Sequence, residues 1–378
     1  MNDSTSPPVF TVAKDHHAAL YPDLPDLESA IRDLLLSGSY ILGPAVDRFE
    51  QDFAGYLGCR DVVGLNSGTD ALILSLMALG IGPGDEVITV ANTFHSTVLA
   101  ITRVGATPVL VDCLPETHLM DLDQLASAIT RRTRAIIAVH LFGRSLDMAA
   151  LTQIAEAAGL VVIEDCAQRR SQSHSRKVGT WGAVGCFSFQ PAKNLPAAGD
   201  AGAIATGDPA IADQIRMLRH LGQSAPNTHV TAGYNSRLDS IQALILGSKL
   251  PHLDAWNTRR AHIAQQYDGR LREVGLPTTG AWIPQEHVFH LYQVTTAHRD
   301  TVLQILRSSG VEAVVRYPVP IHQQPVFASL FPGQCYPVAE QQSLSTVCLP
   351  IRPDLTDADI EYVASTAITA IAAAGLEY

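Results

Sequence analysis

The stretch that decides the fold reads Val161-Val162-Ile163-Glu164-Asp165. A short β-branched run favours a strand, and a continuously apolar one is typical of a parallel strand buried on both faces. The run ends in two carboxylates, at the point where open α/β sheets bind their ligands. Because neighbouring strand residues point to opposite faces, a simple strand-end cap does not account for both Glu164 and Asp165.

Similar apolar runs alternate with Ala/Leu-rich amphipathic segments on both sides of this strand, up to about residue 250. The alternation predicts an α/β fold in which helices cover a mostly parallel, seven-stranded sheet. The predicted strands are 61–65, 86–90, 108–111, 135–140, 161–164, 185–189 and 203–206, and the predicted helices include 70–79, 96–104, 121–129 and 148–158.

The two ends of the chain differ from this pattern. Residues 1–24 are polar and punctuated by proline, which predicts a loosely held N-terminal arm. A long helical stretch at 240–271 contains Pro251 and should be kinked or broken there. Beyond it we predict strands at 291–295 and 314–317 and helices at 301–309 and 358–374. We therefore expect an arm (1–24), a large domain (25–250) and a smaller α+β domain (251–378).

Composition narrows the class of protein. Of 378 residues, 47% are apolar and 17% are charged, which is ordinary for a soluble globular protein. The net charge of −11 argues against a nucleic-acid binder, which needs a basic face. The six cysteines show neither a CxxC pair nor a zinc-like spacing, so we expect no metal site. With no visible signal peptide or membrane span, the sequence predicts a cytoplasmic protein.

The segment Asn66-Ser67-Gly68-Thr69-Asp70 follows an apolar strand and opens a predicted helix. Gly68 permits close backbone approach, and the N–H groups of a helix N-terminus attract anions, so a phosphate fits there. An ordinary helix cap, in which Ser67 or Thr69 satisfies the first amides, explains the same residues.

Lys193 is the best candidate for chemistry among only four lysines. It lies just past a predicted core strand, whereas Lys14 lies in the arm, Lys177 in a polar turn and Lys249 on a predicted helix. A lysine that forms a Schiff base needs a partly desolvated position with room to move. A surface-loop lysine is the alternative, but Asp165 and the phosphate segment weigh against it.

These three features together indicate pyridoxal 5'-phosphate (PLP). A phosphate loop, then an acid, then a lysine 28 residues further on is the order found in PLP enzymes of fold type I. The cofactor requires a carboxylate that keeps its pyridine nitrogen protonated, so that the ring can accept electrons.

The chain resembles the sugar aminotransferases of the DegT/DnrJ/StrS family, which have the aspartate aminotransferase fold. The resemblance runs from about Tyr40 to the C-terminus. It rests on blocks at 41–44 (ILGP), 66–72 (NSGTDAL), 82–87 (GPGDEV), 92–94 (NTF), 163–168 (IEDCAQ), 188–189 (SF), 193–195 (KNL), 199–200 (GD), 233–238 (GYNSRL) and 317–318 (YP) with His322.

The resemblance implies a cofactor role for particular residues. Lys193 would carry the Schiff base and shuttle the proton, and Asp165 would pair with the pyridine nitrogen. Gln168 would reach the 3-oxygen of the ring, and Phe94 would stack on its face. The phosphate would be held by Ser67, Gly68, Thr69 and Ser188.

The resemblance also implies partners. The counterpart of Asn235 reaches the phosphate in the neighbouring subunit, which implies a homodimer with shared active sites. Arg237, Tyr317 and His322 would lie toward the sugar. His95 either faces the substrate or is a structural histidine.

The implied reaction is ping-pong transamination from glutamate, or glutamine, to a keto-sugar. The acceptor would be a nucleoside-diphosphate-linked 3-keto or 4-keto deoxysugar in amino-sugar biosynthesis, including that of antibiotics. Three alternatives stay open: a cyclitol ketone as acceptor, a PLP-dependent sugar dehydratase, and a non-catalytic regulatory relative. The dehydratases carry histidine where Lys193 stands, which argues against the second.

Several residues depart from the family pattern, namely Arg169, Arg170, Pro196, Ala201 and Arg316. They leave the cofactor residues intact and put the substrate pocket in doubt. Arg169 or Arg170 could bind a diphosphate through two parallel hydrogen bonds. A solvated surface turn is the alternative.

Overall fold

The computed structural model describes residues 10–14, 17–168, 172–173, 176–276, 278, 280–283 and 286–375. A seven-stranded sheet lies at its centre, in the order β1-β9-β8-β5-β4-β2-β3. Within it, only β9 runs antiparallel to its neighbours. The strands are β1 (Asp61–Leu65), β2 (Glu86–Val90), β3 (Thr107–Val111), β4 (Thr133–Val139), β5 (Val161–Asp165), β8 (Val184–Ser188) and β9 (Gly202–Thr206). The predicted α/β class and mostly parallel sheet are confirmed.

Both faces of the sheet are buried, which explains why its strands read as continuous apolar runs. In β1, Val63 joins the larger apolar cluster, which includes residues of the helices 68–78, 95–103, 148–158 and 209–218. Its neighbour Val62 joins the cluster on the other face, with residues of the helices 44–57 and 240–249. Cys186 and Phe187 of β8 divide in the same way. Alternate side chains of each strand therefore pack against two separate layers of helices.

The predicted helices 70–79, 96–104 and 148–158 correspond to α3 (Gly68–Ala78), α4 (His95–Arg103) and α6 (Met148–Ala158), with ends shifted by two residues at most. The other helices of this part are α1 (Leu24–Ser37), α2 (Pro44–Leu57), α5 (Leu125–Ala128), α7 (Pro209–Leu218) and α8 (Ser240–Lys249). The predicted helix 121–129 is instead a 3-10 turn (Leu122–Gln124) followed by the single turn of α5. Two short hairpins complete this part, β6–β7 (Gln172–Ser173 and Arg176–Lys177) and β10–β11 (Gln223–Ala225 and Thr228–His229).

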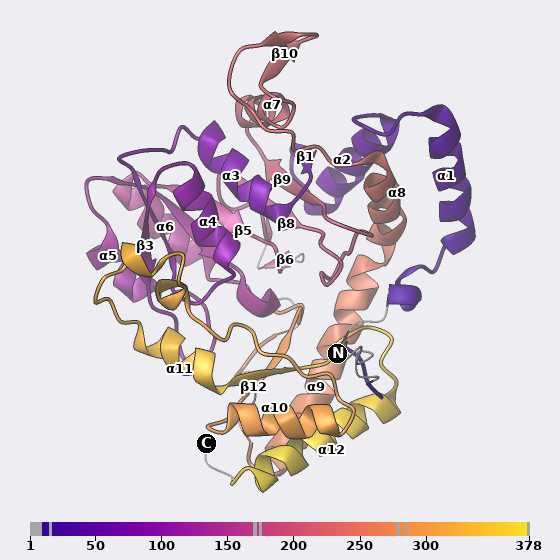
Figure 1. Ribbon diagram of the computed structural model, residues 1–378, viewed down its shortest axis with the longest axis vertical. Coiled ribbons are helices and arrows are strands. Elements are labelled where there is room, and N and C mark those ends of the chain that lie inside the picture. Colours follow the sequence, from indigo (N-terminus) through magenta and orange to yellow (C-terminus); the bar gives the residue numbers. More distant parts are fainter. Residues whose placement is uncertain are drawn as a thin grey trace, which may run out of the picture.

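The long helical stretch is broken at Pro251, as predicted. A 3-10 turn (Leu250–His252) separates α8 from α9 (Leu253–Glu273), and α9 runs down toward α10 and α12 in the lower part of Figure 1. Here the chain forms α10 (Arg299–Ser308), α11 (Pro337–Ser345), α12 (Asp357–Ala373) and a two-stranded sheet of β12 (Tyr292–Thr295) and β13 (Thr346–Leu349). Residues 261–371 supply most of a third apolar cluster.

The strand predicted at 314–317 is wrong. Only Val314 pairs there, through one isolated bridge to Cys348 on the edge of β13 that β12 leaves open. Prolines at 318 and 320 follow at once and cannot donate to a sheet ladder. The segment instead brings Arg316 and Tyr317 to a cavity.

The described part of the N-terminal arm is anchored. Val12 is 1% exposed and belongs to the apolar cluster of residues 261–371. Its amide donates to the Gly310 carbonyl at 3.0 Å, and its carbonyl accepts from the Glu312 amide at 3.0 Å. A 3-10 turn (His17–Leu20) then leads into α1. Within the described ranges, every helix is too short or too polar to cross a membrane.

Candidate active site

A cavity of about 510 Å³ opens where several chain segments meet. The carboxyl ends of β4, β5 and β8 contribute His140, Asp165 and Ser188. The N-terminus of α3 contributes Gly68, and the segment after β8 contributes Lys193. The sheet therefore places its ligand crevice where α/β folds usually have it.

Asp165 lies at the end of β5 and is 6% exposed. One carboxylate oxygen accepts from the Thr97 hydroxyl at 2.9 Å, and the other accepts from the Ala167 amide at 3.1 Å. Burial raises the pKa of the Asp165 carboxyl above its ordinary value, against the opposing effects of the Ala167 amide, the Thr97 hydroxyl and the Lys193 ammonium. A cation placed beside this carboxyl favours its ionised form. The site thus suits a protonated ring nitrogen.

Lys193 is half-buried in a turn whose backbone is fixed by its own amide, which donates to the Gln190 carbonyl at 2.8 Å. Its ammonium is close enough to Asp165 to influence that carboxyl, and both residues line the cavity. Lys177 and Lys249 do not line it, whereas Lys14 does.

The α3 N-terminus fits a phosphate. Ser67 is the cap residue, and its hydroxyl accepts from the Asp70 amide at 3.1 Å, so the capping interpretation is correct for this side chain. The first amides of a helix have no partner within it and are available to an anion. A Cβ on Gly68 would lie 2.6 Å from the Cβ of Ser188, so only glycine lets helix and strand approach this closely. The Thr69 hydroxyl donates to Ser96 at 2.9 Å.

Gln168, Phe94 and Tyr317 form another wall of the cavity. The Gln168 side chain accepts from the Phe142 amide at 2.6 Å and donates to the Tyr317 hydroxyl at 2.8 Å. Burial raises the pKa of Tyr317 above its ordinary range, so the hydroxyl stays neutral and keeps its own proton to donate. The Phe94 ring lies 5.8 Å from the Tyr317 ring and is 44% exposed, with room for a flat partner.

Four residues expected at the site lie outside the cavity lining. His95 is exposed and packs on Phe94, with ring centroids 4.2 Å apart. The Arg237 guanidinium lies 3.2 Å from a His220 ring nitrogen. His322 is buried, with its Nε2 2.9 Å from the Glu340 carboxylate, and Asn235 is exposed.

Other cavity residues were missed by the sequence analysis, because no local pattern marks them. Lys14, Arg260 and His290 all line the cavity, together with Arg316, which stood out only as a departure from the family. They come from segments far apart in the chain, so only the tertiary fold brings them together. Arg169 and Arg170 lie outside the described residues.

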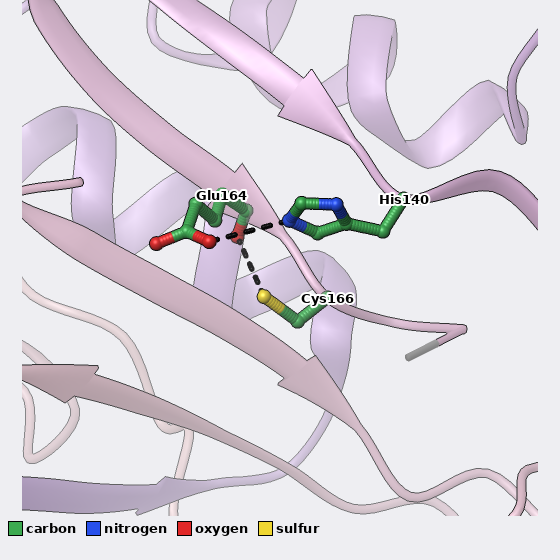
Figure 2. A group of neighbouring side chains, drawn as sticks. All are labelled: His140, Glu164 and Cys166. Atoms are coloured by element: carbon green, nitrogen blue, oxygen red, sulfur yellow. Dashed lines mark hydrogen bonds and ion pairs between the residues drawn. The ribbon is translucent and has the colours of Figure 1, made fainter. Parts of the chain in front are cut away.

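His140, which lines the cavity, forms a fully buried group with Glu164 and Cys166, and the ligand-type atoms of the three lie within 4.8 Å of one another (Figure 2). The Glu164 oxygens already accept four hydrogen bonds, from His140 Nε2 (3.2 Å) and from the amides of Gly179 (2.8 Å), Trp181 (2.7 Å) and Gly182 (2.9 Å). This occupancy makes the group a structural clamp. The two neighbouring carboxylates therefore lie in different surroundings, Glu164 in this buried group and Asp165 at the cavity.

A lysine beside a strand-end carboxylate, under a helix N-terminus shaped for a phosphate, defines a PLP-dependent enzyme of fold type I. The chain belongs to the DegT/DnrJ/EryC1/StrS aminotransferase family, whose model matches residues 25–367. It is therefore an aminotransferase, and PLP is its cofactor.

Three known proteins show how close the similarity is. The chain is 42% identical over 346 residues to the erythromycin biosynthesis sensory transduction protein EryC1 of Saccharopolyspora erythraea, covering 90% of this chain and 94% of that one. It is 42% identical to the dTDP-3-amino-3,4,6-trideoxy-alpha-D-glucose transaminase of Streptomyces venezuelae, covering 89% and 90%. The crystal structure of S. venezuelae DesV in complex with a ketimine intermediate superposes with a TM-score of 0.90 at 40% identity, covering 95% and 98%.

Proposed function

We propose that this aminotransferase moves an amino group from glutamate, or glutamine, to a keto-sugar linked to a nucleoside diphosphate. The acceptor is a 3-keto or 4-keto deoxysugar in amino-sugar biosynthesis. The observation that carries the proposal is the pairing of Lys193 with Asp165 in one cavity. The 42% identity to a transaminase named for a dTDP-linked amino sugar supports the acceptor class.

When bound, PLP supplies a carbonyl that takes up the amine and a ring that accepts the electron pair released at the donor's α-carbon. We assign the cofactor's attachment to Lys193, whose Nζ afterwards moves the proton from that α-carbon. Asp165 would hold the ring nitrogen, and Phe94 would cover one ring face. The α3 terminus would hold the phosphate through Ser67, Gly68, Thr69 and Ser188.

Gln168 and Tyr317 act at the ring edge. The Gln168 amide is oriented by the Phe142 amide, and one of its protons is used by the Tyr317 hydroxyl. Its second amide proton remains for the ring's 3-oxygen, and the Tyr317 hydroxyl can donate to the sugar. We place His95 at the cavity rim. His322 and Arg237 would reach a sugar only by exchanging their present partners, Glu340 and His220.

We further propose a homodimer that shares its active sites and works in the cytoplasm. Asn235 is exposed and lies outside its own cavity, as a residue that serves a neighbouring subunit would. Near it in the chain, Leu221, Val230 and Tyr234 are exposed apolar side chains of the kind that an interface buries.

All six cysteines are free, which suits a reducing compartment. A domain boundary near residue 250 agrees with the separate apolar cluster of residues 261–371.

The test is a spectral titration of the holoenzyme with L-glutamate and L-glutamine. We expect conversion of the aldehyde form of the cofactor to its amine form, and recovery of the aldehyde form when a nucleotide-linked keto-sugar is added. Failure of every amino acid to convert the cofactor would refute the proposal and favour a regulatory role. Recovery with a cyclitol ketone alone would move the acceptor to that class.

A further inference from the structure

Three cations that no cofactor role explains line the cavity, Lys14, Arg260 and Arg316. The Arg260 guanidinium donates to the carbonyls of Phe289 and Ile351, so Lys14 and Arg316 are the candidates for binding a ligand. Lys14 comes from the N-terminal arm, and Arg316 directly precedes Tyr317. In a protein with a net charge of −11, cations gathered at one cavity indicate an anionic ligand.

Hydrogen bonds of the arm's backbone fix the position of Lys14. Its amide donates to the Glu312 carboxylate at 2.8 Å, and the preceding carbonyl, that of Ala13, accepts from Arg352 Nε at 3.0 Å. Val12 pairs with Val311 in a parallel bridge. Ordering a chain terminus costs about 1–2 kcal/mol per residue in backbone entropy. These contacts offset that cost and hold the lysine at the cavity.

Arg316 directly precedes Tyr317 in the chain, and both line the cavity. Its neighbour Tyr317 is hydrogen-bonded to Gln168, three residues beyond Asp165. Burial raises the pKa of the Tyr317 hydroxyl, and the nearby Arg316 guanidinium opposes that shift. Within the described part of the chain, no carboxylate forms an ion pair with Arg316, whose guanidinium contacts the Val315 carbonyl at 3.3 Å.

We propose that Arg316 binds the α-carboxylate of the amino donor and that Lys14 binds its side-chain carboxylate. This proposal rests on the aminotransferase function and adds the residues that select a dicarboxylic donor. The α-carboxylate is one bond from the carbon that loses its proton, so its binding group must lie in the same cavity as Lys193. Arg316 lines that cavity, next to Tyr317. A nucleotide's diphosphate is separated from the ketone carbon by part of the sugar ring.

The two side chains suit these different tasks. A guanidinium binds a carboxylate through two parallel hydrogen bonds and so fixes its orientation. An ammonium on a flexible stem is a point charge that tolerates several positions of a mobile side-chain carboxylate. Arg316 should therefore matter for every amino donor, and Lys14 only for glutamate.

The experiment isolates the first half-reaction. Conversion of the aldehyde form to the amine form is measured against L-glutamate, L-glutamine and L-alanine for the wild type, Arg316→Gln, Arg316→Lys and Lys14→Gln. Arg131→Gln, at an exposed arginine away from the cavity, is the control. The absorbance of the lysine-bound cofactor shows that each variant is folded and loaded.

We expect Arg316→Gln to raise the half-saturating concentration of all three donors about 10- to 100-fold, the loss typical of hydrogen bonds to a charged group. Arg316→Lys should give a smaller loss, because it retains charge without the bidentate geometry. Lys14→Gln should raise the value for glutamate about 3- to 10-fold and leave alanine within about twofold. The wild type should prefer glutamate to glutamine.

Thymidine diphosphate and uridine diphosphate serve as probes of the alternative anion. Their affinity for the amine form, measured by calorimetry, should change less than about threefold in all three variants. Weakened diphosphate binding with unchanged donor saturation would overturn the proposal and leave the aminotransferase function standing. Equal use of glutamine and glutamate by the wild type would also overturn it. If no amino acid converts the wild-type cofactor, the proposed function itself fails, and this assignment fails with it.

Discussion

Replacement of Glu164 by glutamine should destabilise the protein strongly, although the two side chains have the same shape. Each carboxylate oxygen accepts two hydrogen bonds, one pair from the Trp181 and Gly182 amides and the other from Gly179 and His140. An amide group offers one oxygen and one NH2. Whichever way it is turned, its NH2 faces two donors.

The loss amounts to two hydrogen bonds to a charged group, each about 1.5–3 kcal/mol, so we expect about 3–6 kcal/mol. His140 cannot easily relieve the conflict by changing its tautomer, because its Nδ1 accepts from the Leu146 amide at 3.2 Å. Since a domain is stable by only about 5–15 kcal/mol, this change removes a large share of the total. The clamp is fully buried, so solvent cannot replace the lost acceptor.

The assay is equilibrium urea unfolding of the cofactor-free protein, followed by tryptophan fluorescence at one fixed protein concentration. Glu156→Gln makes the same chemical change at an exposed position of α6 and should shift the free energy of unfolding by less than about 0.5 kcal/mol. A Glu164→Gln protein within about 1 kcal/mol of the wild type would refute the reasoning, because the four hydrogen bonds would then carry little stability.

Two further changes test other parts of the structure. Gly68→Ala should weaken PLP binding about tenfold or more, because the added Cβ would lie 2.6 Å from the Cβ of Ser188 and push α3 away. Fluorescence titration of the apoprotein measures this affinity. An unchanged affinity would show that Gly68 is not part of the phosphate site. Burial lowers the pKa of Lys249 from 10.5 to about 8, so between those values the unfolded chain holds a proton that the folded protein lacks, and stability should rise with pH. Lys249→Met should lack that rise. Between pH 8 and pH 10.5, the free energy of unfolding in urea should therefore increase by at most about 3 kcal/mol more for the wild type than for the variant. Parallel pH profiles for the two proteins would contradict the assignment.

The sequence predicted the sheet well, and Asp165 and Lys193 line the cavity at the carboxyl ends of its strands, because both features depend on local patterns. The run ending in Glu164 and Asp165 marked a buried strand and the separation of the two acids. The turn after β8 marked Lys193. In each case the relevant signal lies within a few residues of the side chain concerned.

The substrate side could not be predicted in this way. Lys14, His290 and Arg316 share a wall only because the arm and the C-terminal region pack together. The segment 314–317 has the composition of a strand, but only Val314 pairs with β13, and prolines at 318 and 320 follow at once. His322 carries a family motif, yet its ring nitrogen is held by Glu340, which no motif indicated.

The central claim is that Lys193 carries the cofactor, and the chain's four lysines allow a direct test of it. Borohydride reduction of the holoenzyme converts the Schiff base to a stable bond, and peptide mass spectrometry then locates the attached pyridoxyl group. The structure predicts modification of Lys193 alone. A pyridoxyl group on Lys14, Lys177 or Lys249, with Lys193 unmodified, would contradict it.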